Sequence, residues 1–271
     1  MQSNGMGQQS VGLYLMAQHG MTPKLDYSIF SDPGKEKKET YEIYEWLKGL
    51  SNENSWTKIV LNDDKNLYKD ILNQENSTGH RFASIPAFTK SGGMIRRQCT
   101  SEYKIEPVNR SIRKIQGLNP GQVFKPVNVW FGISLDEMDR MNAPRRKNVI
   151  HVYPFCGYYH DGKKLHKLDW GLEMTRSDIS AWLGTNGYPI PPKSSCVFCP
   201  FQNNRNWRDL KNNHPEDWAA AVKADEAIRN MSQRGMNDKI YIHRSCTPLK
   251  DANLQEEQTE LNFDCFGYCG V

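Results

Sequence analysis

The sequence predicts an α/β protein with a doubly wound parallel sheet. Short runs rich in β-branched and aromatic residues are separated by stretches of helical periodicity, and this alternation is typical of parallel sheets flanked by helices. The run that ends at Phe30 is followed at once by the polar turn Ser31–Gly34, as at the carboxyl end of a parallel strand. We expect strands at Leu25–Phe30, Ile59–Leu61, Phe82–Phe88 and Val127–Ser134.

The chain length of 271 residues fits one α/β domain with an added C-terminal region. We place the α/β domain at 1–190, and a helical region carrying cysteines, with a tail packed on it, at 191–271. The net charge of +4 permits binding of phosphates or nucleic acid, but it is smaller than that of a dedicated nucleic-acid-binding protein.

The cellular compartment is predicted from two features that the sequence lacks, a membrane span and a signal sequence. No apolar run approaches the roughly 20 residues of a membrane span, and the N-terminus does not resemble a signal sequence. We therefore expect a cytoplasmic protein. In that compartment the seven cysteines are better interpreted as metal ligands, reactive thiols or core residues than as disulfides.

A glycine-rich turn, Ser3–Ser10, precedes the first predicted helix, with only Met1–Ser3 before it as a strand. Glycines let the backbone approach an anion, and the free amides of a helix start attract it. The pattern predicts a phosphate-binding loop, and a plain loop is the alternative. The candidate binding residues are Gly5, Gly7, Gln9 and Ser10.

The turn after the second predicted strand contains Asp32 and Gly34. Since ligands bind at the carboxyl ends of parallel strands, both residues are candidates for the same binding site. The alternative is that Asp32 only shapes the turn.

The stretch Gly92–Arg113 combines two cations with a potential metal ligand. Arg96 and Arg97 follow two glycines and precede Cys99, which suggests that an anion binds beside a metal. After Cys99 an apolar stripe at helical spacing alternates with basic residues, and Pro107 should bend or restart that helix. The alternative is an amphipathic helix with a solvated basic face and a buried free cysteine.

The sharpest motif is the pair Cys196 and Cys199, because two thiolates in one tight turn can bind one metal centre. A single pair is ambiguous between a redox dithiol, half a zinc site and half an iron–sulfur site. Cys99 is the first candidate for a further ligand. Two other clusters rank lower: the basic triplet Arg145–Lys147, interpreted as solvated charge, and a set whose spacing matches no ligand pattern, His151, Cys156, His160 and His166.

The C-terminal tail carries Cys265 and Cys269 after an acidic linker, Gln255–Glu260. Cysteines so near the end of the chain are not expected in the core. A tethered tail can move onto an active site.

Five motifs occur in one order along nearly the whole chain: Gly7–Ser10, Asp32–Gly34 with Glu39–Tyr41, Cys99 with Tyr103–Pro107, the Cys196 and Cys199 pair, and Cys269-Gly270. The combination resembles the phosphoadenosine phosphosulfate (PAPS) reductase family. It is most similar to the PAPS-reductase-like proteins, often carried by phages, of the adenine nucleotide alpha hydrolase group. The resemblance implies a five-stranded parallel sheet with an adenine nucleotide at Gly5–Ser10 and near Asp32.

The resemblance also implies a [4Fe-4S] cluster bound by Cys99, Cys196 and Cys199, with zinc as the alternative metal. Gln98 stands where the family's first cluster cysteine would be, so the fourth ligand is expected from the tail, provisionally Cys265, or one iron stays open. Cys269 takes the role of the nucleophile, and Arg96 and Arg97 neutralise the anion. Gln9 replaces the Asp of ATP-pyrophosphatase loops, which favours the reductase branch.

Three functions follow as hypotheses. The first is a sulfonucleotide-reductase-like oxidoreductase that acts on adenylyl sulfate (APS) or PAPS, with a thioredoxin-like electron donor. The second is an ATP-dependent sulfurtransferase that modifies tRNA or DNA. The third is a non-catalytic nucleotide-binding protein with structural zinc.

Overall fold

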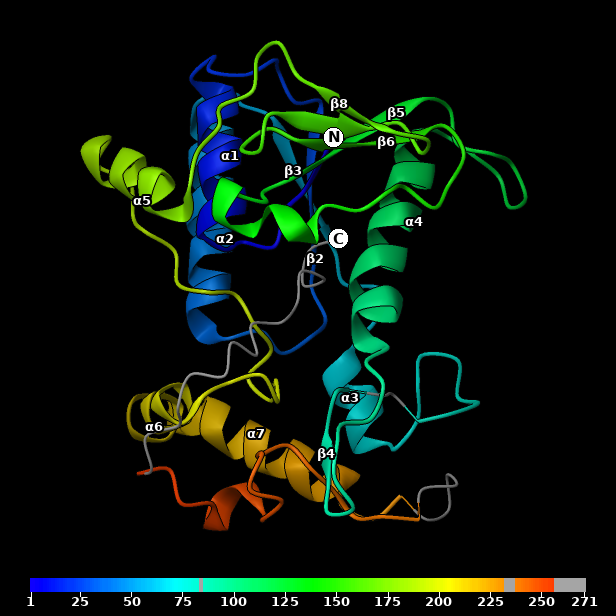
Figure 1. Ribbon diagram of the computed structural model, residues 1–271, viewed down its shortest axis with the longest axis vertical. Coiled ribbons are helices and arrows are strands. Elements are labelled where there is room, and N and C mark those ends of the chain that lie inside the picture. Colours follow the sequence, from blue (N-terminus) through cyan, green and yellow to red (C-terminus); the bar gives the residue numbers. More distant parts are fainter. Residues whose placement is uncertain (83–84, 232–236, 256–271) are drawn as a thin grey trace.

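The computed structural model describes residues 1–82, 85–231 and 237–255 (Figure 1). Over these residues, the main sheet has seven strands in the order β3-β2-β1-β5-β6-β7-β8. The first five strands in this order pair in parallel, and the last two pair antiparallel as an appended hairpin. Its strands are β1 (Gln2–Ser3), β2 (Tyr27–Ser31), β3 (Lys58–Asn62), β5 (Val127–Phe131), β6 (Val149–Tyr153), β7 (Tyr158–His160) and β8 (Leu165–Lys167).

The predicted α/β fold with a mostly parallel sheet is confirmed. One predicted strand, Phe82–Phe88, is wrong, because β4 covers only Phe88–Thr89 and pairs with β9 (Ile240–Tyr241) in a separate two-stranded sheet. Pro86, which precedes this short strand, has no amide hydrogen and cannot donate to a sheet ladder.

The helices cover both faces of the main sheet. Helices α1 and α2 lie on one face and α4 on the other (Figure 1). The remaining short helical segments are a π-helical turn, η1 (Ser101–Ile105), and two 3-10 turns, η2 (Leu135–Arg140) and η4 (Leu249–Asp251). The α-helices are α1 (Gln8–Gln18), α2 (Lys38–Glu53), α3 (Leu67–Leu72), α4 (Glu106–Ile115), α5 (Arg176–Thr185), α6 (Asn204–Asn213) and α7 (Pro215–Ile228).

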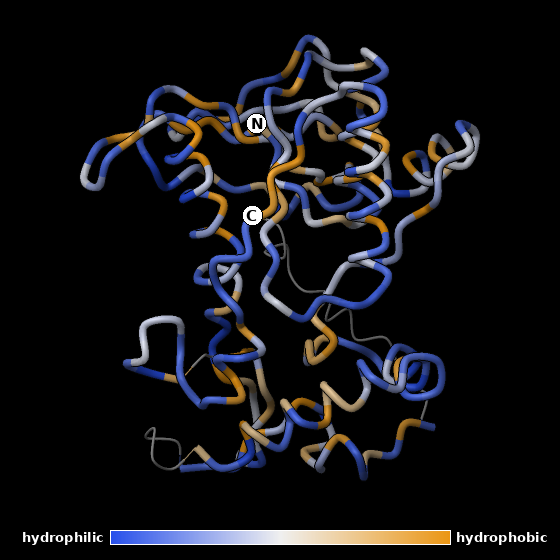
Figure 2. The backbone as a smooth tube through the Cα atoms, turned by 180° about the vertical axis from the view of Figure 1, so that it is seen from behind, coloured by the Kyte–Doolittle hydropathy of each residue, from blue (hydrophilic) through white to orange (hydrophobic). Residues whose placement is uncertain are grey.

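Strand alternation distributes the core between the two faces. Neighbouring residues of β2 point to opposite sides, so Phe30 packs with α1 and α2, whereas Ile29 packs with α4. On β5, Trp130 packs on the α1–α2 face of the sheet, and Val129 and Phe131 pack on the α4 face. Figure 2 shows hydrophobic residues gathered along these central strands. Burial on both faces explains the consecutive apolar residues Ile29–Phe30 in β2 and Val129–Phe131 in β5.

A second core lies below the sheet, between α3, α6 and α7 (Figure 1). Trp207 is fully buried there. Asp225, also fully buried, accepts hydrogen bonds from the backbone amides of Ile242 (2.8 Å) and Leu249 (2.9 Å), which attaches the last described segment to α7. Helix α3 comes from 1–190 and α6 and α7 from 191–271, so both parts of the chain contribute to this core.

None of the described helices is long and apolar enough to cross a membrane.

We expect Trp207→Ala to lower the free energy of unfolding by about 3–5 kcal/mol, because it empties the centre of the second core. Chemical denaturation followed by circular dichroism measures the change. The control Val123→Ala truncates a side chain that is 59% exposed and should stay within about 0.5 kcal/mol of the wild type. An equal effect of the two substitutions would contradict this description of the core.

Candidate functional site

The candidate site lies where the strand order reverses. Strand β1 is central, with β2 on one side and β5 on the other, and the chain passes from β1 to β2 and β3 before it returns to β5 and β6. In open α/β sheets such a reversal opens a crevice at the carboxyl ends of the strands, where ligands bind.

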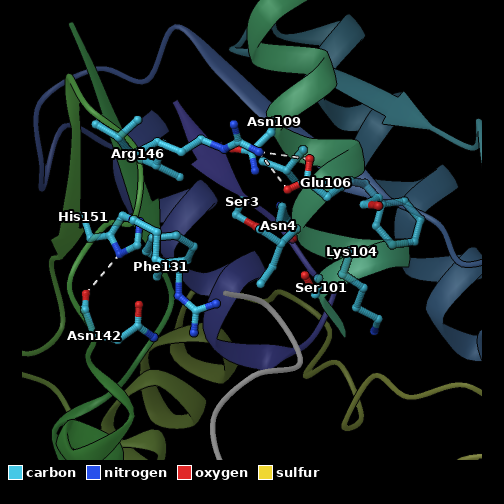
Figure 3. Close-up of a pocket in the computed structure, with 18 of the residues that line it drawn as sticks. Ser3, Asn4, Ser101, Lys104, Glu106, Asn109, Phe131, Asn142, Arg146 and His151 are labelled. Carbon is cyan, nitrogen blue, oxygen red and sulfur yellow. Dashed lines mark hydrogen bonds and ion pairs between the residues drawn. The ribbon is translucent and has the colours of Figure 1, made fainter. Parts of the chain in front are cut away.

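A cavity of about 400 Å³ occupies this position (Figure 3). We call it the larger cavity, because a second cavity of about 40 Å³ shares part of its wall. The walls of the larger cavity come from the ends of β1, β2, β5 and β6, from the η1–α4 segment and from the loop that precedes β6. The volume is that of a site for a small organic ligand. Its lining includes Ser3, Asn4, Lys104, Phe131, Arg146 and His151.

The charged residues of the larger cavity are mainly cationic. Lys104, Arg145 and Arg146 line it together with one carboxylate, Glu106. Arg146 donates two hydrogen bonds to Glu106, at 2.7 and 3.0 Å, and so links the loop to α4 across the cavity (Figure 3). The cavity therefore favours an anionic ligand. The basic triplet Arg145–Lys147 is exposed, as interpreted from the sequence, yet its two arginines also belong to the cavity wall.

His151 supplies a neutral polar edge to the larger cavity. Its Nδ1 lies 3.0 Å from the backbone oxygen of Asn142, and burial lowers the pKa of its imidazole to about 4. Cys156, which the sequence groups with His151 as a possible metal ligand, donates through its thiol to the backbone oxygen of Ile133 at 3.2 Å. His151 therefore acts as part of the cavity wall.

The predicted phosphate-binding loop connects β1 to α1. Gly5 lines the larger cavity, and Gly7 is the N-cap of α1, so no side chain caps the amides of the first turn. Gln9 donates through Nε2 to Ser134 Oγ (2.8 Å) and to Glu137 Oε2 (2.6 Å), and Ser10 Oγ donates to the backbone oxygen of Gly7 (3.2 Å).

Gly132, directly after β5, lets the backbone of this loop pass very close. A Cβ atom at Gly132 would lie 2.8 Å from the amide nitrogen of Ser10 and 2.9 Å from the carbonyl carbon of Gln9. Such contacts are too short for a side chain, so the position of the loop depends on a residue more than 120 positions away.

Asp32 and Gly34 form the turn that follows β2. The Oδ1 atom of Asp32 accepts hydrogen bonds from the Gly34 amide (2.8 Å) and the Tyr41 hydroxyl (2.9 Å). Gly34 has a φ of +94°, and a Cβ atom there would collide with Asn66. These contacts give Asp32 a turn-shaping role, and neither residue lines the larger cavity; their neighbour Pro33 lines a smaller one.

The smaller cavity, of about 40 Å³, brings the three predicted cysteines together. Cys99 reaches it from the start of the η1 segment, and Cys196 and Cys199 reach it from one tight turn in which the Cys199 amide donates to the Cys196 oxygen (3.0 Å). We call it the cysteine cavity. Its apolar wall consists of Leu67, Ile85, Phe198 and Phe201, among others.

Burial dominates the electrostatics of the thiols. It raises the pKa of Cys99 to about 11, and it raises the pKa values of Cys196 and Cys199 as well. The neighbouring thiols add to this effect, and the cations Lys104 and Arg97 oppose it at Cys99. All three side chains are therefore protonated thiols at neutral pH unless a metal displaces the protons.

Lys104 lines both the larger cavity and the cysteine cavity, so the two lie on either side of one side chain. Its ammonium group bonds Oε1 of the buried Glu36 at 2.8 Å. Despite burial, the carboxylate of Glu36 raises the pKa of Lys104, which keeps it charged.

The remaining predicted site residues divide into two groups. Arg97 lines the cysteine cavity, with its guanidinium 5.8 Å from the centre of the Phe201 ring, whereas Arg96 is exposed and is not part of the wall. Cys265 and Cys269 lie outside the described residues.

The donor chemistry of the cysteine cavity fits the metal centre implied by the resemblance. Three thiols around one cavity are the ligand type of iron–sulfur clusters and of structural zinc. Within the described ranges, no group of three or more His, Cys, Asp or Glu side chains is already placed to hold a metal ion.

Sequence reasoning missed Glu36 and Lys104 as wall or neighbouring residues of the cavities, and it ranked Arg145, Arg146 and His151 low. The two arginines precede β6 and His151 lies within it, so their position relative to a strand is the signal in the sequence that points to them. Nothing local in the sequence marks Glu36.

Comparison with known proteins adds no relative: no family model, no curated protein and no solved structure matches the chain significantly.

We expect His151 to stay neutral in the folded protein down to about pH 4, because burial disfavours its charged form. Its folded pKa lies below the unfolded value of about 6.5, so its contribution to stability is present above pH 6.5 and is lost as the pH falls toward 4. NMR titration of the imidazole measures this. The same residue in the urea-unfolded chain is the control, and a folded-state midpoint near 6.5 would contradict the burial of His151.

Proposed function

We propose that this chain is a cytoplasmic, adenine-nucleotide-binding enzyme of sulfur chemistry that resembles the PAPS reductases. In this proposal it reduces, or transfers sulfur from, an adenylyl-sulfate-type substrate. The observation that carries the proposal is the shared wall at Lys104, which sets a nucleotide-sized cationic cavity directly beside three cysteines.

The larger cavity supports binding of a nucleotide in several ways. Its volume of about 400 Å³ suits a nucleoside, and Phe131 and Val129 provide an apolar surface for a base. Arg145, Arg146 and Lys104 provide charge for phosphate or sulfate oxygens. The uncapped start of α1 lies at the end of the same loop that brings Gly5 to the cavity.

The cysteine cavity supports the sulfur chemistry. Cys99, Cys196 and Cys199 would hold a [4Fe-4S] cluster, which would add charge and redox capacity beside the substrate's sulfur; zinc would add charge alone. Lys104 would face the sulfate group of a nucleotide in the larger cavity and stabilise its negative charge.

The nucleophile in this proposal is Cys269, by resemblance to the reductases. Its thiolate attacks the sulfur of the adenylyl sulfate, AMP leaves with the bonding electron pair, and a protein S-sulfonate forms. A thioredoxin-like dithiol then releases sulfite and becomes a disulfide. Arg97, in the wall of the cysteine cavity, would favour the thiolate form of an approaching thiol, and the exposed Arg96 beside it in the sequence would add positive charge at longer range.

The first test is turnover under anaerobic conditions. With reduced thioredoxin, we expect the wild type to release sulfite together with AMP from APS, or with adenosine 3′,5′-bisphosphate from PAPS. Cys269→Ser should release no sulfite while it still binds nucleotide. Ion chromatography measures both products. AMP and pyrophosphate formed from ATP only when RNA or DNA is present would replace the reductase with the sulfurtransferase. Nucleotide binding and stoichiometric zinc without turnover would leave a non-catalytic binding protein.

The second test concerns the loop at Gly5–Ser10. Gly132→Ala should weaken binding of adenine nucleotide at least tenfold, because the added Cβ atom displaces the backbone of Gln9 and Ser10. The matched control is Gly184→Ala, where an added Cβ atom meets nothing within 4 Å. Calorimetry gives both affinities. Unchanged affinity in a folded Gly132→Ala would place the nucleotide away from this loop.

A further inference from the structure

Glu36 is fixed beside Cys196 by the backbone. The two residues form an isolated antiparallel bridge. On either side of it, the Lys37 amide donates to the Ser195 oxygen (3.2 Å), and the Val197 amide donates to the Lys35 oxygen (3.1 Å). The turn after β2 and the segment that carries the cysteine pair are thus joined at this point, although 160 positions separate Glu36 from Cys196.

The carboxylate of Glu36 is enclosed and only partly satisfied. Its side chain is 1% exposed, and Oε1 lies 2.8 Å from Lys104 Nζ and 3.8 Å from Cys196 Sγ. Oε2 is also buried and has no hydrogen-bond partner among the residues that the structure describes. A buried carboxylate oxygen without a partner is costly, and such atoms in native proteins commonly bind an ion or water.

The local charges favour a cation as that partner. Lys104 and Glu36 already balance one another as an ion pair. When Cys99, Cys196 and Cys199 bind a metal they become thiolates and add three negative charges, which the metal centre itself must offset. Once the metal is bound, it is the cation that the carboxylate oxygen Oε2 of Glu36, beside Cys196, can bind.

We propose that Glu36 supplies the fourth ligand of the metal centre held by Cys99, Cys196 and Cys199. The inference rests on the metal centre of the proposed function. It gives the site three thiolates and one carboxylate, which binds through Oε2 while Oε1 keeps its bond to Lys104. It also removes the need for Cys265, the ligand expected from the tail. Carboxylate oxygen is an established ligand of both zinc and iron.

The experiment compares three substitutions in the full chain, purified and reconstituted anaerobically with iron and sulfide. Glu36→Gln keeps the size of the side chain and removes its charge. Cys265→Ser removes the competing tail ligand. Glu39→Gln is the matched control, because it removes a carboxylate three positions away that pairs with His214 instead. Iron and sulfide analysis, Mössbauer spectra and thermal unfolding of the metal-free proteins are recorded for each.

We expect about four irons per chain in the wild type, in Cys265→Ser and in Glu39→Gln, with one iron site in the Mössbauer spectrum distinct from the three thiolate-bound sites. In Glu36→Gln that distinct site should be lost, leaving about three irons and, after one-electron oxidation with ferricyanide, the paramagnetic resonance signal of an oxidised three-iron cluster. Equal thermal stability of the metal-free proteins would show that the loss is not unfolding.

Three results would overturn the inference. Glu36→Gln with a full and unchanged cluster would show that the carboxylate is not a ligand. A wild type with four thiolate-bound irons and no distinct site, from which Cys265→Ser loses one iron while Glu36→Gln keeps all four, would return the role to the tail. A wild type that binds zinc alone would refute the cluster of the proposed function, and retention of all that zinc by Glu36→Gln would then refute the carboxylate ligand separately.

Discussion

The two-residue strand β1 is the constraint on which the site depends. It pairs in parallel with β2 and β5 at once, and its fully buried Gln2 is part of a polar network inside the sheet. Gln2 Nε2 donates to the Ser10 oxygen (2.6 Å) and Gln2 Oε1 accepts from Ser28 Oγ (3.0 Å), which in turn accepts from Asn4 Nδ2 (3.1 Å). A buried network of this kind is favourable only when every member is satisfied, so it specifies one position for the start of α1.

The continuous η1–α4 segment joins the two cavities. Thr100 and Lys104 line the cysteine cavity, and Lys104, Glu106 and Asn109 line the larger one. The π-helical turn changes the phase of the side chains just before Pro107, which is accommodated at the start of α4. Because the segment is continuous, a displacement of one wall by a ligand would also displace the other, and this is the geometric basis for treating the two cavities as one site.

The site also concentrates groups that a stable core would avoid. Glu36 and Lys104 are a buried ion pair beside three thiols, and a buried pair of this kind adds little to stability compared with apolar residues of similar size. Under the proposed function, their retention in the interior would be explained by their contacts with a bound group. The adjoining second core, around Trp207, has apolar packing that can offset this cost.

The sequence by itself determined the local features: the alternation of strands and helices, the glycine-rich start of α1, and the cysteine pair that a tight turn brings together. It also indicated Cys99 as a partner, since a cysteine beside two arginines is unusual. The predicted strand at Phe82–Phe88 shows that local composition alone does not determine a strand. Pro86 cannot donate a backbone hydrogen bond, and only Phe88 of this run joins a strand, β4, which pairs with β9.

Only the tertiary structure decided how distant residues combine. The bridge between Glu36 and Cys196, the approach of Gly132 to Ser10 and the sharing of Lys104 by two cavities each join segments far apart in the chain. Such contacts depend on the order of strands in the sheet and on which helix covers which face. Local periodicity carries no information about either, because the residues of one strand do not specify which strand pairs with it or which helix covers it.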